Sequence, residues 1–317
     1  MPESSPWDEI GVPISDFNVK RIAGNMAVPC YWGRNRFGLC LFILDLDGDL
    51  AENFRNNNVQ MNGVEVDLRT DGSQQRLLLT LEKQADRDLF EGFCRTLAKA
   101  LEYANDSASS LNIALAHIRR WKVFMSGRSQ HLSAEEVRGL FAELIFLGEL
   151  VNQLGAKAAV EAWKGPERSH QDFIFGNAAV EIKSLSGAER NSIRISSEDQ
   201  LESLNDNLFL RIYRLSDLPD VASAHSLNEL IAEIQDKLDF SEAVEAFNDK
   251  LAAHAYVPLP EYDAPKYVVS EIQSYRVEGD FPRVIRARLP AGISNVSYDI
   301  RIESITVFGC NEVLRAK

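Results

Sequence analysis

Three ionisable residues, Asp172, Glu181 and Lys183, have the types and the spacing that suit binding of a divalent cation. Two carboxylates that face each other on adjacent strands repel unless positive charge lies between them. Lys183 follows Glu181 by two residues, so the period of two along a strand places its ammonium on the same face. Hard cations such as Mg²⁺ prefer carboxylate oxygens and keep several waters, so these residues predict a magnesium site.

A β-hairpin would bring these residues together. Gly176 and Asn177 form the predicted two-residue turn, because glycine can adopt the positive φ that such a turn requires. Folding about this turn pairs Phe175 with Ala178 and, counting outward, places Asp172 opposite Glu181. The other face of the hairpin is apolar and suits a core; it consists of Phe173, Val180 and Ile182.

A helix before the hairpin carries a fourth candidate, Glu143. Ser133 and Glu136 have the spacing of a capping box, which predicts a helix that continues to Leu154, with Gly155 as its stop. Glu143 then falls among leucines on the buried side, where an unpaired carboxylate would be costly. It either approaches the cation, directly or through a water, or pairs with a nearby arginine.

Three further polar residues flank these acids. His170 precedes Asp172 by two residues, so it either contacts a phosphate from the same face or simply lies in a loop. Ser196 and Gln200 belong to a short predicted helix after the hairpin. Capping of that helix by Ser196 or Ser197 is the favoured interpretation of the serines.

The rest of the chain predicts an α/β (α+β) protein in three parts. Residues 1–126 read as a β-rich region with two helices, at about 87–103 and 109–124. Residues 127–215 begin with a polar linker and contain the long helix, a strand at 158–163, the hairpin, the short helix at 197–204 and a strand at 207–215. Residues 216–317 show helices at 226–238 and 241–253, then antiparallel strands at 267–277, 284–289 and 296–308.

Bulk composition fits a globular protein of the cytoplasm. The chain has 317 residues, more than a single core usually serves, with 45% hydrophobic and 26% charged residues. Its start is polar, which argues against a signal peptide, and its longest clear apolar run is too short to span a membrane. Four scattered cysteines without a Cys-x-x-Cys pair predict reduced thiols rather than a zinc site. The net charge of −13 opposes binding of a polyanion unless the cleft is locally basic.

The pattern Asp-x(8)-Glu-x-Lys on adjacent strands resembles the PD-(D/E)XK nucleases, and more closely a defence-associated bacterial branch of that family. The resemblance covers about residues 133–215. Gln171 stands where the family's eponymous motif has proline, a departure that weakens the match only slightly. The matching segments are residues 139–144, Trp163-x-Gly165, Asp172-Phe173, Glu181-Ile182-Lys183 and residues 194–201.

This resemblance implies a restriction-endonuclease-like core, with a mixed sheet flanked by helices, and Mg²⁺-dependent hydrolysis of phosphodiester bonds in DNA, with Mn²⁺ as a possible substitute. Asp172 and Glu181 would bind the metal together with the Ile182 carbonyl, and Glu143 would hold a second metal or a metal-bound water. Lys183 would orient or help deprotonate the attacking water and stabilise charge in the transition state.

The resemblance also implies a role in restriction or anti-phage defence, with defence-system partner proteins and with a homodimer as one option for the oligomeric state. RNA is the less favoured substrate, and no membrane is expected. The alternative is a catalytically inactive scaffold of the same fold that binds nucleic acid or a defence partner. The complete Asp/Glu/Lys set argues against this alternative, whereas the acidic balance of the chain argues for it.

Overall fold

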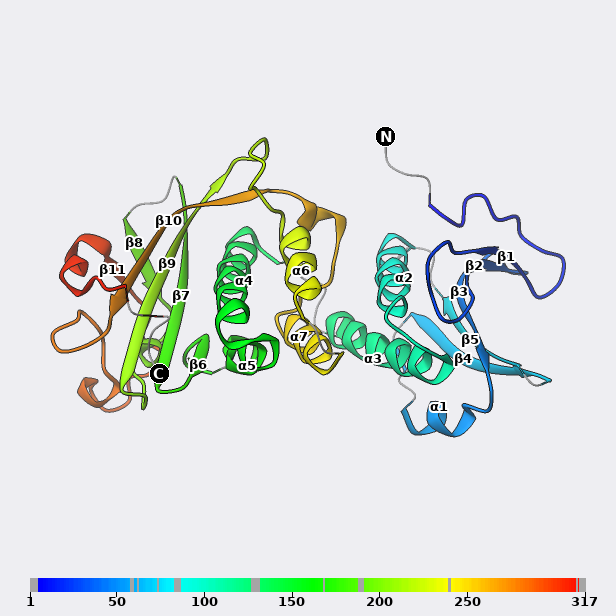
Figure 1. Cartoon of the computed structure of the whole chain (residues 1–317), viewed down its shortest axis with the longest axis horizontal. Coiled ribbons are helices and arrows are strands. Elements are labelled where there is room, and N and C mark those ends of the chain that lie inside the picture. Colours follow the sequence, from blue (N-terminus) through cyan, green and yellow to red (C-terminus); the bar gives the residue numbers. More distant parts are fainter. Residues whose placement is uncertain are drawn as a thin grey trace. The chain divides into compact units, whose positions relative to one another are not determined.

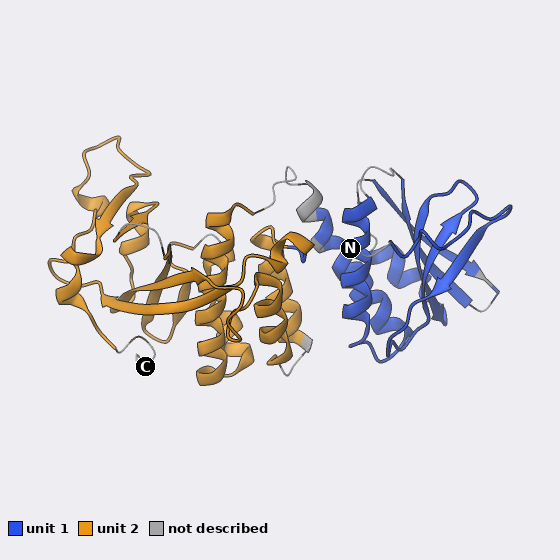
Figure 2. Cartoon of the chain, turned by 90° about the horizontal axis from the view of Figure 1, so that it is seen from above, with its two compact units in different colours: residues 1–130, 257–259 blue, residues 131–256, 260–317 orange. Residues whose placement is uncertain are grey.

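A computed structural model gives the fold of the chain (Figure 1). It describes residues 5–311 and 313, apart from 58–59, 62, 73, 83–86, 127–131, 168, 188–190 and 239–240. The chain forms two compact units (Figure 2): unit 1 holds residues 1–130 and 257–259, and unit 2 holds residues 131–256 and 260–317. In the part that the structure describes, no helix combines the length and apolar character needed to cross a bilayer.

Unit 1 is built on an antiparallel sheet with the strand order β1-β2-β3-β5-β4. Trp7 lies at its core, where the ring packs edge-on against Trp32 and stacks on Phe90. This unit confirms the predicted β-rich region with two long helices. Its elements are β1 (Phe17–Arg21), β2 (Cys30–Asn35), β3 (Cys40–Asp47), α1 (Ala51–Asn57), β4 (Val64–Asp71), β5 (Gln74–Leu81), α2 (Arg87–Leu101) and α3 (Ser107–Ser126).

Unit 2 is built on a mixed sheet with the strand order β10-β9-β7-β6. β7 and β9 run parallel, whereas the β6–β7 and β9–β10 pairs are antiparallel. The mixed sheet and its helices confirm the predicted α/β class. The elements are α4 (Ala134–Leu154), α5 (Ala156–Ala162), β6 (Phe173–Phe175), β7 (Ala178–Ser186), β8 (Ser192–Ile195), β9 (Asn207–Asp217), α6 (Leu227–Asp236), α7 (Ser241–Ala253), β10 (Tyr267–Arg276) and β11 (Tyr298–Arg301).

The two faces of this sheet have different neighbours. On one face α4 contacts β7, and Figure 1 shows α4 beside the sheet with β8 and β11 on its other side. On that other side, Ala179 and Leu185 of β7 share a buried cluster with Ile193 and Ile195 of β8. Because alternate residues of a strand share a face, Glu181 and Lys183 also point to the β8 side.

The hairpin has the predicted register. Phe173 pairs with Val180, Ile174 with Ala179 and Phe175 with Ala178. Gly176 adopts φ 54°, the left-handed conformation that the turn requires. The apolar face packs against α4, where the ring of Phe146 meets that of Phe173 edge-on. The register therefore follows from the turn and from the burial of one face.

The long helix α4 begins and ends as predicted. The Ser133 hydroxyl accepts a hydrogen bond from the Glu136 backbone N–H, the Glu136 carboxylate accepts one from the Ser133 N–H, and Gly155 follows the last turn. The stripe predicted to be buried is buried in the structure, with Leu140 and Leu147 at most 3% exposed.

The strand predicted at 158–163 is wrong, because these residues belong to helix α5 and only Trp163 makes an isolated bridge, to Phe173. Alanine has the highest helix propensity, and the buried positions Ala156, Ala159 and Val160 repeat at helical spacing. A short apolar run is compatible with a strand or a helix. Here the buried residues are spaced by three and four, which favours the helix. The first strand of the predicted order α-β-β-β-α-β is therefore replaced by a helix, α5.

The predictions for the short elements also need correction. The helix predicted at 197–204 is a 3-10 turn at Glu198–Leu201, and β8 was not predicted as a strand. Residues 284–289 contain the 3-10 turn Arg286–Arg288 between two prolines, and 296–308 form only the short β11 followed by 3-10 turns. Proline cannot donate a ladder hydrogen bond, which limits strand formation there.

The linker predicted at residues 126–130 lies almost entirely outside the described residues. Unit 2 combines the segment from 131 to 215 with the C-terminal segment, because β10 pairs with β9 along most of its length. The predicted division at residue 215 stays a prediction.

We expect Ser133→Ala to lower the free energy of unfolding by about 1 kcal/mol, because it removes the hydroxyl that accepts from the first turn of α4. Chemical denaturation followed by circular dichroism measures this. Ser133→Asp keeps an acceptor at the cap and should stay near the wild type. Equal stability of the alanine variant and the wild type would contradict the role of the cap.

Candidate metal centre

Asp172 lies immediately before the edge strand β6. Hydrogen bonds to its side chain and to its backbone carbonyl both hold it in place. Its Oδ2 accepts a hydrogen bond of 2.7 Å from the backbone N–H of Ile182 on β7. Its backbone carbonyl accepts from the N–H groups of Lys164 (2.6 Å) and Gly165 (3.0 Å). The hydrogen bond from Ile182 turns the side chain toward β7, one residue beyond Phe173, where the printed pairing of the hairpin ends.

Glu181 is almost completely buried, with 1% of the residue exposed. One of its oxygens, Oε1, lies 2.7 Å from Nζ of Lys183. The other, Oε2, is buried and has no hydrogen-bond partner among the described residues. A buried acceptor without a partner costs free energy, so this oxygen is either a defect of the fold or a group kept for a ligand.

Lys183 connects the acids to the 3-10 turn after β8. Its Nζ donates to Gln200 Oε1 at 3.3 Å, and the same oxygen accepts from the Ser196 backbone N–H at 2.7 Å. Burial opposes the charged form of Lys183, but the charges of Glu181 and Asp172 outweigh burial and raise its pKa. The amine therefore stays protonated and acts as a hydrogen-bond donor.

Glu143 approaches the hairpin from α4, beside the edge strand. Its Oε2 accepts a hydrogen bond of 2.7 Å from Nε1 of Trp163 and lies 3.3 Å from Nε2 of His254. Among the described residues its ion-pair partner is thus a histidine rather than the arginine that was the predicted alternative.

The carboxylates of Glu143 and Asp172 both lie close to Gly165, because this residue has no side chain. A Cβ at this position would lie 2.8 Å from Glu143 Oε2 and 3.2 Å from Asp172 Oδ1. The two carboxylates therefore approach a common point that any side chain at 165 would occupy. A side chain at 165 would therefore displace the Glu143 carboxylate, whereas φ at Gly165 is outside the left-handed region and does not itself favour glycine.

Burial and neighbouring carboxylates raise the pKa values of Asp172 and Glu181. Burial raises the pKa of Asp172 well above its ordinary value, and the charges of Glu181 and Glu143 add to this. Burial raises the pKa of Glu181 to about 7 although Lys183 opposes the shift. Carboxylates that resist ionisation in the absence of compensating charge are typical of sites that bind a cation.

The donor set fits a hard divalent cation. Asp172 and Glu181 supply carboxylate oxygens, Oε2 of Glu181 has no hydrogen-bond partner among the described residues, and Oδ1 of Asp172 is directed to the place that a side chain at 165 would take. No three His, Cys, Asp or Glu side chains among the described residues are close enough to hold one ion. Two acids with water completing the shell is an arrangement that Mg²⁺ accepts.

The remaining predicted residues have other surroundings. His170 is exposed, and its Nδ1 lies 3.8 Å from Asp199 Oδ2. Ser197 caps the 3-10 turn, since its Oγ accepts from the Asp199 N–H at 3.2 Å. Capping by serine is confirmed there. Gln200, one of the polar residues that the sequence places near the acids, accepts a hydrogen bond from Nζ of Lys183. His254 was missed because its position gives no signal before α7 is folded against Trp163.

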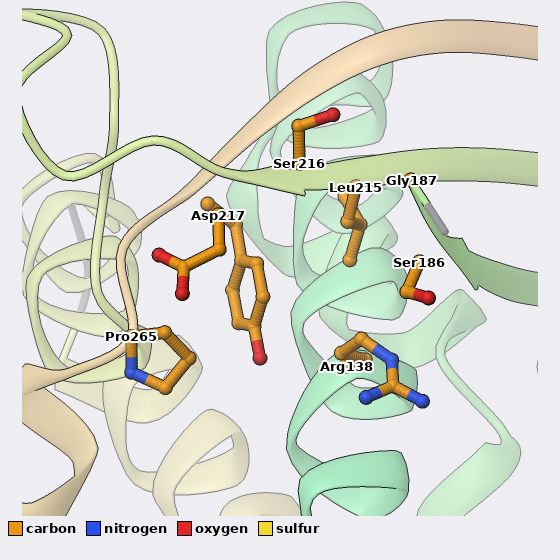
Figure 3. A pocket seen from close by; sticks show the side chains of 8 residues that line it. Arg138, Ser186, Gly187, Leu215, Ser216, Asp217 and Pro265 are labelled. Atoms are coloured by element: carbon orange, nitrogen blue, oxygen red, sulfur yellow. The ribbon is translucent and has the colours of Figure 1, made fainter. Parts of the chain in front are cut away.

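A separate cavity of about 340 Å³ lies at the carboxyl ends of β7 and β9 (Figure 3). None of the predicted site residues lines it. Figure 3 shows the guanidinium of Arg138, from the start of α4, below Ser186. The lining consists of Arg138, Ser186, Gly187, Leu215, Ser216, Asp217, Pro265 and Tyr267.

Residues 4–303 match the model of a protein family described as "Putative PD-(D/E)XK family member, (DUF4420)". No curated protein and no solved structure matches the chain. The family match extends well beyond residues 133–215, the range of the resemblance seen in the sequence, and includes nearly all of unit 1. Unit 1 is therefore part of what characterises this family.

We expect Gly165→Ala to weaken binding of Mn²⁺ several-fold, because the new methyl would displace the carboxylate of Glu143. Isothermal titration calorimetry measures the affinity. Gly148→Ala is the matched control, since a Cβ there meets nothing within 4 Å in the middle of α4. The control should bind Mn²⁺ like the wild type and gain up to about 1 kcal/mol of stability. Unchanged affinity in Gly165→Ala would contradict convergence of the acids on this space.

We expect Asp172→Asn to stabilise the metal-free protein, because it removes one of the mutually repelling charges. The pKa of Asp172 is raised in the folded state, so wild-type stability falls as the pH rises from about 3.8 through the folded pKa. The advantage of the variant should therefore be larger at pH 8 than at pH 5. Denaturation at both pH values tests this, with the exposed Asp220→Asn as control. A variant less stable than the wild type at pH 8 would contradict it.

Proposed function

Because the chain belongs to this family of PD-(D/E)XK-related proteins, we propose that it is a metal-dependent endonuclease that hydrolyses phosphodiester bonds in DNA. The single observation that supports this most is the buried Glu181, whose unpartnered Oε2 lies in a group with Asp172 and Lys183. A fold that only needed stability would gain nothing from this arrangement. It is suited to a cation and a phosphate.

In this proposal Asp172 and Glu181 hold Mg²⁺ or Mn²⁺, and the Ile182 carbonyl is the third protein ligand. The cation, when bound, polarises the phosphate and makes water a better nucleophile. The hydrogen bond from the Ile182 N–H fixes one oxygen of Asp172, which leaves Oδ1 directed to the space near Gly165. The raised pKa of both acids means that cation binding displaces protons, so binding should strengthen as the pH rises.

Lys183 acts on the reacting phosphate in this scheme. Its pKa is raised, so it keeps its proton and stabilises the charge that develops on the phosphate oxygens. It also orients the attacking water by hydrogen bonding. Between the two roles toward water that the resemblance left open, a protonated amine favours orientation of the water over removal of its proton. Gln200 holds the ammonium from the side of the 3-10 turn.

Glu143 is the proposed ligand of a second cation or of a water bound to the first. Its carboxylate shares the space at Gly165 with Asp172, which supports this role. The oxygen at that space is Oε2, which also accepts from Trp163 Nε1 and lies 3.3 Å from His254 Nε2.

The biological part of the proposal is restriction or anti-phage defence in the cytoplasm, with DNA favoured over RNA. Described cysteines are free thiols, which suits a reducing compartment. The net charge of −13 weakens autonomous binding of a polyanion, so we propose that partner proteins or a homodimer help to load the substrate.

The second candidate is a catalytically inactive scaffold that binds nucleic acid or a defence partner. The observation that favours it is the same negative charge. It predicts no cleavage under any metal condition, whereas the endonuclease predicts cleavage that depends on the acids and the lysine.

We expect the purified protein to cut plasmid DNA in Mg²⁺ or Mn²⁺, and Asp172→Ala and Lys183→Ala each to lower the rate by at least about a hundredfold, as loss of a group that stabilises transition-state charge does. Agarose gels over a time course measure this, with an RNA substrate in parallel. The surface variants Asp220→Ala and Lys157→Ala are matched controls and should cut like the wild type. Cleavage that survives both site variants would refute the assignment, and an inactive wild type would favour the scaffold.

A further inference from the structure

Helix α7 lies outside the residues that resemble the nuclease core, yet one of its faces is directed at the candidate metal centre. Phe247, Lys250 and His254 are spaced by three and four residues, so they share a face of α7 and of the turn that follows it. All three contact Trp163.

These contacts fix Trp163 and the residues after it from several directions. The ring of Phe247 packs against the indole at 5.9 Å between centroids, and the imidazole of His254 stacks on it at 5.4 Å and 22°. Nζ of Lys250 donates to the Trp163 carbonyl and to Glu167 Oε1. Gly165 lies between these two anchored residues, so α7 determines where the space for the acids is.

Trp163 and His254 also meet at the same atom of Glu143. The indole Nε1 donates to Oε2 at 2.7 Å, and His254 Nε2 lies 3.3 Å from it. The imidazole nitrogen is buried and makes no hydrogen bond within the described residues. The imidazole therefore restricts the movement of the Glu143 carboxylate by close contact, and the indole of Trp163 supplies the hydrogen bond.

We propose that His254 is a positioning residue for Glu143. The end of α7 would then help to set the geometry of the metal centre. His254 keeps the indole in the plane from which it donates to Glu143, and it closes the side from which the carboxylate could turn away from Asp172. The inference rests on the proposed function only in that Glu143 serves the cation. The positioning itself exists without metal and is testable there.

The first test measures hydrogen exchange of the Trp163 indole N–H by NMR in the metal-free protein, with Trp163→Phe to identify the resonance. We expect His254→Leu to speed exchange about tenfold, which corresponds to about 1.4 kcal/mol. His254→Gln keeps a polar group that can reach the carboxylate and should restore slow exchange. His225→Leu is the matched control, because His225 also lies near a glutamate, at 3.4 Å from Glu233, but far along the chain from the site.

The second test measures Mn²⁺ affinity of the same variants by titration calorimetry. We expect His254→Leu to bind several-fold more weakly and His254→Gln to recover most of the loss, with both melting temperatures close to the wild type. Exchange and affinity that are unchanged in His254→Leu would overturn the proposal. So would a His254→Gln variant that behaves like His254→Leu, because the effect would then be one of packing alone. If the exchange results hold and the wild type binds no Mn²⁺, positioning stands and the metal-dependent function fails.

Discussion

The enforced approach of Asp172 and Glu181 is the constraint on which the rest of unit 2 depends. The hairpin pairing ends at Phe173 and Val180, directly before these two residues, and the hydrogen bond from the Ile182 N–H to Asp172 Oδ2 holds the carboxylate of Asp172 at β7. Like charges at such positions destabilise a sheet. The fold tolerates them because the apolar face of the same hairpin is buried against α4, and slipping the register by one residue would expose that face.

The neighbouring residues compensate this repulsion only in part. Lys183 neutralises Oε1 of Glu181, while Oε2 stays buried without a partner among the described residues. The pKa values of both acids are raised, so the folded protein without a cation holds their protons more tightly than the unfolded chain does. Such a site lowers the free energy of unfolding in the absence of a ligand. Binding of a ligand of opposite charge to the folded state raises that free energy. This is the physical reason to associate the arrangement with a function rather than with folding.

The surroundings of the site are drawn from separate parts of unit 2. The acids and the lysine come from the hairpin, Gln200 from the turn after β8, Glu143 from α4, and His254 from the end of α7. Gly165 has no chemistry of its own, but the absence of a side chain lets Glu143 and Asp172 approach one another. A family match that covers nearly the whole chain agrees with a site whose support is spread over the fold.

The sequence by itself determined the hairpin and its register, because turn chemistry and strand alternation are local rules. It also determined the start and the stop of α4 through Ser133 and Gly155. Only the tertiary structure decided that a side chain at position 165 would meet Glu143 and Asp172, and that His254 reaches Glu143. Those features depend on contacts between residues far apart in the chain, and no local pattern encodes which distant side chain fills a given space.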